Sequence, residues 1–150
     1  MVVKKFKCPL GELTLVADDK ALQGIFFKNL PETGTSKILE QTQKQLNEYF
    51  SGIRKEFDLP LEFKGTDFQK RVWSALLTIP YGETRSYADI ARQVGSPKAV
   101  RAVGLANSKN PISIIAACHR VIGSNGKLTG YAGGLHNKEY LLRLENAQVA

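Results

Sequence analysis

The chain has 150 residues, of which 43% are hydrophobic, and a formal net charge of +7. This composition is sufficient for one domain or two small lobes with an apolar core, and it excludes a disordered chain. Residues 65–150 hold eleven Lys and Arg against five Asp and Glu, so they carry +6 of the net charge. A basic half of this kind favours nucleic acid as the partner over an anionic membrane, because no basic amphipathic helix is present.

The chain has two cysteines, Cys8 and Cys118, which is too few for a disulfide framework and indicates a reducing compartment. The N-terminal residues lack the apolar core of a signal peptide, and no apolar run has the length of a membrane span. The cysteines and the two histidines lack zinc-ligand spacing. We therefore expect a cytoplasmic protein without a metal or other cofactor.

The first half is predicted to form a small antiparallel sheet with one covering helix. Residues 2–7, 12–17 and 21–27 have the pattern of three short strands joined by turns. A helix of about 14 residues follows, in which Leu39, Thr42, Leu46 and Tyr49 recur at helical spacing before Ser51 and Gly52 end it. Residues 57–63 alternate like a strand, but Pro60 restricts them to an edge strand or an extended segment.

The composition changes at residues 64–65, where we place the boundary between a mainly structural N-terminal lobe, residues 1–64, and a second domain, residues 65–150. Thr66 and Gln69 have the spacing of a capping box and predict a helix start. The predicted core residues of this helix are Phe68, Val72, Trp73 and Leu76. The fold class is therefore α+β, with a mainly helical second half.

A helix-turn-helix is predicted over about residues 86–108. Ser86 is the expected cap of a short helix that Gly95 ends. Ser96 as N-cap and Pro97 in the first helical position predict that a second helix begins immediately and runs to about Ser108.

The second of these helices has two distinct faces. Val100, Val103 and Asn107 are predicted to point inward, and Lys98, Arg101, Ala102 and Leu105 outward. Because only Lys98 and Arg101 are long enough to reach bases, we expect close contact with the DNA backbone and little sequence discrimination. The alternative is a structural helical pair with an exposed arginine.

A buried apolar run, residues 112–117, leads directly to Cys118, His119 and Arg120. Most free cysteines simply pack, so an inert thiol is one interpretation. The other is a nucleophile, with His119 as the base that activates it. Neighbours in an extended strand face opposite ways, so Cys118 and His119 can cooperate only across a bend or through a bridging water. Glu145 is a candidate to orient the imidazole, and a cysteine hydrolase would use the same residues.

A tight turn at residues 124–127 and a glycine-rich loop at residues 128–134 follow. Such a loop is able to close over a flat ligand, with Tyr131 available for stacking. The last predicted helix, about residues 137–146, has Tyr140, Leu141 and Leu144 as packing residues.

The motifs of residues 66–145 resemble those of the O6-alkylguanine-DNA alkyltransferases, also called methylated-DNA-protein-cysteine methyltransferases. The resemblance is carried by TDFQKRVWSALLTIPYGETRSYADIARQVGSPKAVRAVGLANSKNPISII, CHRVIGSNGKLTGYAGGL and KEYLLRLE. The first half matches the N-terminal lobe of the family in plan only.

The resemblance implies direct-reversal DNA repair, in which Cys118 irreversibly accepts the alkyl group of O6-alkylguanine from a flipped-out base in duplex DNA. O4-alkylthymine is a second candidate substrate. The implied catalytic residues are Cys118, His119, Glu145, Tyr87 and Asn110. The implied substrate contacts are Arg101, Val121, Tyr131, Ala132 and Gly133. The implied DNA contacts are Lys98, Ala99, Arg101, Ala102 and Ser124.

The resemblance also implies a monomer that needs no cofactor, no membrane and no obligate protein partner. It would act at the nucleoid in a prokaryote and in the nucleus in a eukaryote. Two alternatives are a protein that binds alkylated bases without repairing them, and a helix-turn-helix regulator with a buried cysteine. Ala117 departs from the family, which has proline before the cysteine, and we expect it to loosen the presentation of Cys118.

Overall fold

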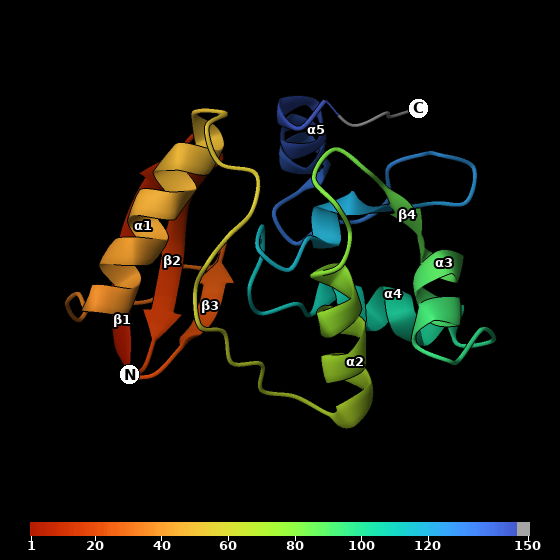
Figure 1. The fold of residues 1–150 in the computed structure, drawn as a ribbon, viewed down its shortest axis with the longest axis horizontal. Helices are drawn as coiled ribbons and strands as arrows, with labels where there is room; N and C mark the ends of the chain where they lie inside the picture. The colour runs from red at the N-terminus through yellow and green to blue at the C-terminus, as the bar shows by residue number, and fades with distance from the viewer. Residues whose placement is uncertain (147–150) are drawn as a thin grey trace. The chain divides into compact units, whose positions relative to one another are not determined.

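The computed structural model describes residues 1–146 and divides the chain into two compact units, Met1–Phe63 and Lys64–Ala150. In the first unit, β1 (Val2–Cys8), β2 (Gly11–Ala17) and β3 (Leu22–Phe26) form an antiparallel sheet in the order β1-β2-β3. Helix α1 (Lys37–Phe50) packs on this sheet (Figure 1). The predicted meander and covering helix are confirmed.

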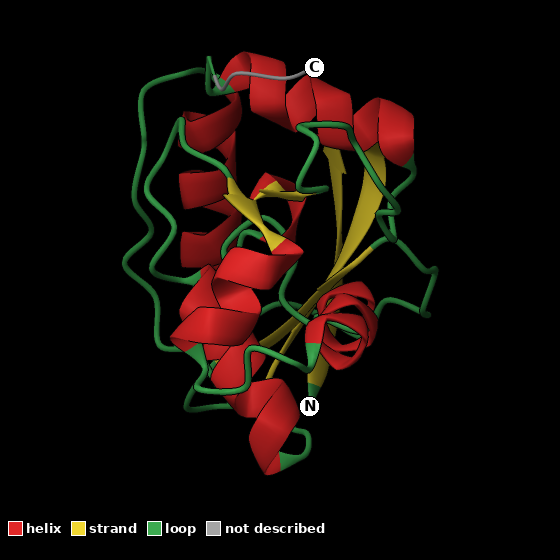
Figure 2. Cartoon of the chain, turned by 90° about the vertical axis from the view of Figure 1, so that its right-hand side faces the viewer, coloured by secondary structure: helices red, strands yellow, loops and turns green. Residues whose placement is uncertain are grey.

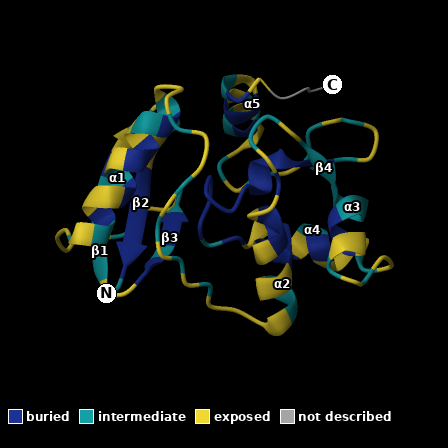
Figure 3. Cartoon of the chain, viewed as in Figure 1, coloured by how far each residue is buried: buried dark blue, intermediate teal, exposed yellow. Residues whose placement is uncertain are grey.

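The core of the first unit lies between β2 and α1. Strand β2, the central strand, is buried from Leu13 to Ala17 (Figure 3), and α1 packs against one of its faces. The α1 residues buried against the sheet include the four predicted from helical spacing, Leu39, Thr42, Leu46 and Tyr49. Residues 57–63 are extended and make one parallel bridge, between Leu22 and Leu61, which agrees with the effect expected of Pro60.

The second unit contains the helices α2 (Asp67–Leu76), α3 (Tyr87–Gln93), α4 (Val100–Ser108) and α5 (Leu135–Leu144). Helices α2, α3 and α4 pack against one another (Figure 2), and Trp73 Nε1 donates a hydrogen bond to Ala106 O at 2.8 Å. The capping box predicted at Thr66 and Gln69 is present. Ser86 caps α3 in the same way, since its side chain and that of Asp89 bond each other's main-chain N–H groups.

The prediction for the start of α4 was wrong. The helix begins at Val100, because Ser96 to Ala99 form a turn closed by a hydrogen bond from Ala99 N to Ser96 O at 2.9 Å. Proline is as well suited to the second position of such a turn as to the first turn of a helix. Val100, the first residue of α4, was predicted to point inward but is 38% exposed.

Three other local predictions also need correction. Helix α5 starts two residues before the predicted residue 137 and ends at Leu144. Tyr140, predicted to pack, is 36% exposed, and Leu142 is buried instead. Phe68, a predicted core residue of α2, is only half-buried.

A short parallel pair joins distant parts of the second unit. Strand β4 (Arg85–Ser86) pairs with β5 (Val121–Ile122), so the residues before α3 lie beside those that follow Cys118. Within residues 1–146 the chain therefore has a three-stranded antiparallel sheet, this two-stranded pair and five α-helices, an α+β fold. No helix in this part of the chain is long and apolar enough to cross a membrane.

Candidate active site

The apolar run before Cys118 is a folded loop held by Asn110. The Asn110 side chain donates to Ala116 O at 2.7 Å and accepts from Ile112 N at 3.1 Å, so its amide spans the loop. Ile114 has a φ of +75°, in the left-handed region that a branched residue rarely adopts. This irregular backbone takes the chain directly into a 3-10 turn, η1 (Cys118–Arg120).

The 3-10 turn is the bend that would allow Cys118 and His119 to cooperate. Both side chains are buried, and Cys118 is only 3% exposed. Burial raises the pKa of the Cys118 thiol, while hydrogen bonding from Asn110 and the positive charge of Lys138 oppose this shift. The thiol is therefore neutral in the free protein and must lose its proton in order to react as a thiolate.

His119, Glu145 and Arg120 form a buried cluster. His119 Nε2 lies 2.8 Å from Glu145 Oε2, and Arg120 donates to both oxygens of this carboxylate, from Nε at 2.8 Å and from Nη2 at 3.0 Å. Arg120 Nη1 also donates to Ile79 O at 2.6 Å. Because the carboxylate can only accept, it holds the proton of His119 on Nε2 and leaves Nδ1 as the basic nitrogen.

The charges in this cluster are fixed by their neighbours. Burial alone would raise the pKa of Glu145, but His119 and Arg120 outweigh it and hold that pKa at about 2. Burial lowers the pKa of His119, although Glu145 acts in the opposite direction. The resting cluster is thus a neutral imidazole beside a permanent ion pair, and the carboxylate is placed to stabilise an imidazolium when one forms.

Arg120 and Lys138 are functional candidates that the sequence analysis missed. Lys138 lies in α5 with its side chain fully buried, and its Nζ donates to Val121 O at 2.6 Å and Thr129 O at 3.2 Å. Burial lowers its pKa to about 8. One signal was available, because Lys138 has helical spacing with Leu141 and Leu142 and so lies on the apolar stripe of α5.

A pocket of about 590 Å³ lies between α4 and the glycine-rich loop. It brings together four residues singled out in the sequence: Tyr87, Arg101, Tyr131 and Ala132. Thr129 and Asn107, which were not singled out as site residues, also line it. The Tyr87 hydroxyl lies 2.6 Å from Thr129 Oγ1. Asn107 Oδ1 is a buried acceptor without a hydrogen-bond partner in residues 1–146.

The other predicted site residues lie outside the lining of this pocket. Cys118, His119, Asn110, Val121 and Glu145 are buried, Gly133 is half-buried, and Ser124 is exposed in the turn after β5. Lys98 and Ala99 line a separate hollow with Ser96 and Pro97, and Ala102 is exposed on α4. The pairing of β4 with β5 connects the pocket to the buried residues around Cys118, since Tyr87 follows β4 and Cys118 precedes β5.

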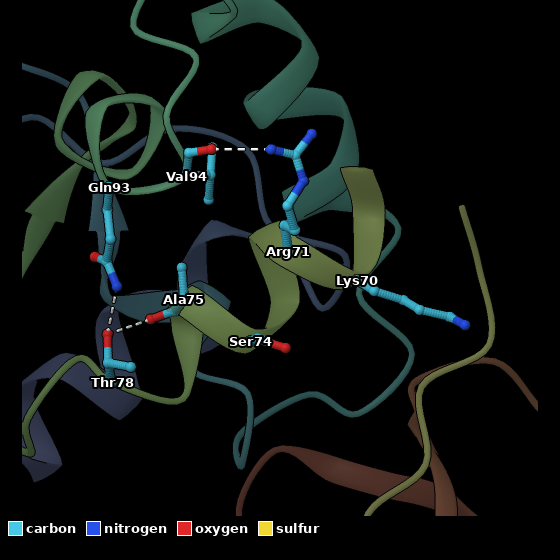
Figure 4. A pocket seen from close by; sticks show the side chains of 7 residues that line it. All are labelled: Lys70, Arg71, Ser74, Ala75, Thr78, Gln93 and Val94. Carbon is cyan, nitrogen blue, oxygen red and sulfur yellow. Dashed lines mark hydrogen bonds between the residues drawn. The ribbon is translucent and has the colours of Figure 1, made fainter. Parts of the chain in front are cut away.

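A second hollow, of about 450 Å³, lies against α2 and the end of α3 (Figure 4). Arg71 Nη1 donates to Val94 O at 3.0 Å, and Gln93 Nε2 donates to Thr78 Oγ1 at 2.9 Å. Its lining contains none of the predicted site residues. Among residues 1–146, no group of three or more His, Cys, Asp or Glu side chains could hold a metal ion.

Comparisons with known proteins identify the family. Residues 67–147 match the DNA-binding domain of 6-O-methylguanine DNA methyltransferase, and residues 1–63 match the ribonuclease-like domain of the same family. The chain belongs to this family. The resemblance inferred from the motifs around Cys118 is therefore confirmed.

Two relatives illustrate the similarity in sequence. A methylated-DNA--protein-cysteine methyltransferase from Mycobacterium leprae is 60% identical over 151 residues, which covers 94% of this chain and 90% of the relative. One from Methanosarcina acetivorans is 49% identical over 150 residues, covering 95% of this chain and 96% of the relative.

Solved structures agree with the sequence comparison. Mycobacterium tuberculosis O6-methylguanine methyltransferase has a TM-score of 0.89 at 50% identity, covering 97% of this chain and 93% of that one. The Mycobacterium tuberculosis protein OGT in complex with DNA has a TM-score of 0.90 at 51% identity, covering 96% and 92% of the two chains.

Proposed function

We propose that this chain repairs DNA by transferring the alkyl group of O6-alkylguanine to Cys118, which becomes a thioether and is not regenerated. The observation that carries the proposal is a buried pair 2.8 Å apart, His119 on the turn that begins with Cys118 and Glu145 at the end of α5. Membership of a family whose members are named methylated-DNA--protein-cysteine methyltransferases supports the same reaction.

The proposed step is a direct displacement. His119 Nδ1 takes the thiol proton through a bridging water, and Glu145 stabilises the imidazolium that results. The sulfur then forms a bond to the alkyl carbon as the bond from that carbon to guanine O6 breaks. The electron pair of the broken bond stays with guanine, and Tyr87 donates a proton to this leaving group. The imidazolium proton returns to the phenolate through solvent, so one thiol and one alkylguanine give one thioether and one guanine.

The target guanine is proposed to leave the DNA stack before the reaction. Cys118 is too deeply buried to reach an atom inside a duplex, so flipping the base is the route to contact. Arg101, exposed on α4 beside the pocket, would fill the space left in the stack. Backbone groups of Val121, Tyr131, Ala132 and Gly133 would hold the flipped base.

DNA binding is proposed to depend on shape and charge. Lys98, Ala99, Ala102 and Ser124, with Arg101, would contact the backbone, and the small side chains of α4 would allow close approach without base reading. Asn110 would act by holding the loop before Cys118. O4-alkylthymine is proposed as a second substrate. Residues 1–64 are proposed to have a mainly structural role, in a protein that acts as a cytoplasmic monomer.

Intact-mass measurement tests the transfer directly. The protein is mixed with a duplex that contains one O6-methylguanine, and we expect the mass to rise by the replacement of one hydrogen with one methyl group. Peptide mapping should locate the methyl on Cys118. Cys118→Ser should gain no mass, while Cys8→Ser, which removes the half-buried second thiol, should react like the wild type.

Two results would contradict this proposal. Tight binding to the damaged duplex without a gain in mass would indicate a protein that recognises alkylated bases and does not repair them. A gain in mass that persists in Cys118→Ser would place the acceptor elsewhere.

Base flipping has its own test. Arg101→Ala should slow transfer from a duplex by about tenfold or more, and should change transfer from a short single strand far less, because no stack has to be opened there. Lys127→Ala removes an exposed positive charge that is not assigned to DNA contact and serves as the control. Equal slowing of Arg101→Ala on both substrates would argue against the assigned role.

A further inference from the structure

The hydroxyl of Thr129 is the hydrogen-bond partner of the Tyr87 phenol. The two oxygens are 2.6 Å apart, and either can be the donor. Both residues line the pocket between α4 and the glycine-rich loop. Tyr87 is the first residue of α3, whereas Thr129 lies in a loop without secondary structure. The position of Thr129 therefore depends on contacts that the loop makes with other elements.

Helix α5 supplies that support. Lys138 Nζ donates to Thr129 O at 3.2 Å and to Val121 O at 2.6 Å, so one ammonium ties the loop to β5. Asn137 Nδ2 donates to Gly133 O at 3.0 Å, farther along the same loop. Thr129 therefore has its carbonyl held by α5 while its hydroxyl points to Tyr87.

Burying the Lys138 ammonium costs free energy, which its hydrogen bonds must offset. Its side chain is fully buried, and no carboxylate in residues 1–146 lies within ion-pair distance of it. A charge buried without a counter-charge is destabilising unless its hydrogen bonds are well satisfied. Here the main-chain carbonyls of Val121 and Thr129 accept those bonds, and the ammonium thereby fixes the position of the loop.

We infer that Thr129 is a positioning residue for the Tyr87 phenol, and that its hydroxyl donates a hydrogen bond to the phenol oxygen as the phenol protonates the leaving guanine. The inference rests on the proposed function, in which Tyr87 is the proton donor. When Thr129 donates, the phenol hydrogen is free to point into the pocket. When the proton leaves, the same bond stabilises the phenolate until solvent returns a proton to it.

Two substitutions separate the hydroxyl from the shape of the side chain. Thr129→Val keeps the shape and removes the hydroxyl, while Thr129→Ser keeps the hydroxyl. With O6-methylguanine duplex and excess protein, we expect Thr129→Val to slow transfer by about tenfold or more and Thr129→Ser to stay within about threefold of wild type. In the Tyr87→Phe background, Thr129→Val should have no further effect, because the partner that it acts through is gone.

A reaction without a guanine leaving group is the control for structural damage. Iodoacetamide alkylates a thiol with iodide as the leaving group, so it requires no proton from Tyr87. Its rate with Cys118, measured in the Cys8→Ser background, should be the same in wild type and Thr129→Val. Slowing of both reactions by Thr129→Val would overturn the positioning role, and so would a transfer rate from DNA equal to that of wild type.

A measurement without DNA separates this inference from the proposed function. Tyrosine labelled with 13C at the ring carbon that bears the hydroxyl gives one NMR signal per residue, and Tyr87→Phe assigns the signal of Tyr87. We expect Thr129→Val to shift this signal and Thr129→Ser to leave it nearly in place. An unchanged signal in Thr129→Val would overturn the hydrogen bond itself. If the wild type transfers no methyl group, the proposed function fails, the role of Thr129 fails with it, and the NMR result still decides whether the pair exists.

Discussion

The two units of this protein bury different kinds of side chain. The buried polar residues of the first unit are Thr14, Thr42 and Gln45, all neutral, whereas the second unit buries His119, Arg120, Lys138 and Glu145. The first core gains its stability from apolar area. The second also contains charges whose desolvation is costly, so their arrangement is better explained by chemistry at Cys118 than by stability.

The charges of the second core also differ among themselves. Glu145 satisfies two partners, His119 and Arg120, with both of its oxygens. Among residues 1–146, the hydrogen-bond partners of Lys138 are the main-chain carbonyls of Val121 and Thr129. Removing Glu145 should therefore destabilise the fold strongly, while replacing Lys138 should not.

The largest effect is expected for Glu145→Leu. It leaves the guanidinium of Arg120 and the imidazole of His119 buried without their acceptor, so we expect the free energy of unfolding to fall by about 3–5 kcal/mol. Urea denaturation measures this change. Glu139→Leu, which breaks the exposed pair with Arg143, is the matched control and should cost about 0.5 kcal/mol or less. A small loss in Glu145→Leu would show that the cluster is hydrated rather than dry.

Lowering the pH should remove the stabilising effect of the same cluster in the wild-type protein. Glu145 has its pKa lowered to about 2, so its contribution to stability is complete above its unfolded pKa and is lost as the pH falls towards about 2. The shift corresponds to about 3 kcal/mol. The pKa of His119 is also lowered, so stability should begin to decline below the unfolded pKa of histidine. Urea midpoints measured from neutral pH to about pH 3 test this course, and Glu145→Gln should lack the more acidic part of the decline.

Lys138→Met should instead increase the free energy of unfolding. Burial lowers the Lys138 pKa to about 8, which corresponds to a cost of about 3 kcal/mol while the ammonium is charged. Methionine removes that cost but takes a donor away from two carbonyls, at about 1 kcal/mol each, so we expect a net gain of about 1 kcal/mol at neutral pH. Transfer from DNA should slow, because the loop loses its tie to β5. Lys127→Met, at an exposed position, is the control and should change neither quantity.

The cost of burying the charged Lys138 should also appear in the pH dependence of the wild-type free energy of unfolding. Because the folded pKa of Lys138 lies below its unfolded value, stability should rise as the pH passes from about 8 towards the unfolded pKa of lysine. Lys138→Met should lack this rise. A variant that is less stable than wild type at neutral pH would show that the two hydrogen bonds outweigh the desolvation of the ammonium.

Local signals explain what could be predicted from the sequence. Strands β1 to β3 and helices α1 and α2 follow from alternation, helical spacing and caps, each of which depends on neighbouring residues. The β4–β5 pair was missed because each strand has only two residues, and the partners are far apart in the sequence. The start of α4 was misplaced because Pro97 suits a turn as well as a helix start.

The candidate site could be predicted only in part. Chemistry directed attention to Cys118, His119 and Glu145, and the family resemblance supplied the proposed roles of Tyr87 and Arg101. Arg120 and Thr129 were missed as site residues because their importance lies in tertiary partners, Glu145 for one and Tyr87 for the other. Composition and spacing cannot reveal such partners, because an exposed and a buried arginine have the same sequence signature.

The smallest effect concerns Ala117, where the family resemblance predicts proline. Ala117 has a φ of −80°, which proline can adopt, and its N–H donates no hydrogen bond within residues 1–146. Ala117→Pro therefore removes freedom from the unfolded chain without breaking a bond, and should stabilise the protein by about 0.5–1 kcal/mol. Ala117→Gly is the opposite control and should destabilise it by a similar amount. Urea denaturation measures both, and transfer in Ala117→Pro should be at least as fast as in the wild type, because Cys118 would be held more firmly. Lower stability of Ala117→Pro would mean that the fully buried site has no room for the ring, and that the loop has adapted its packing to alanine.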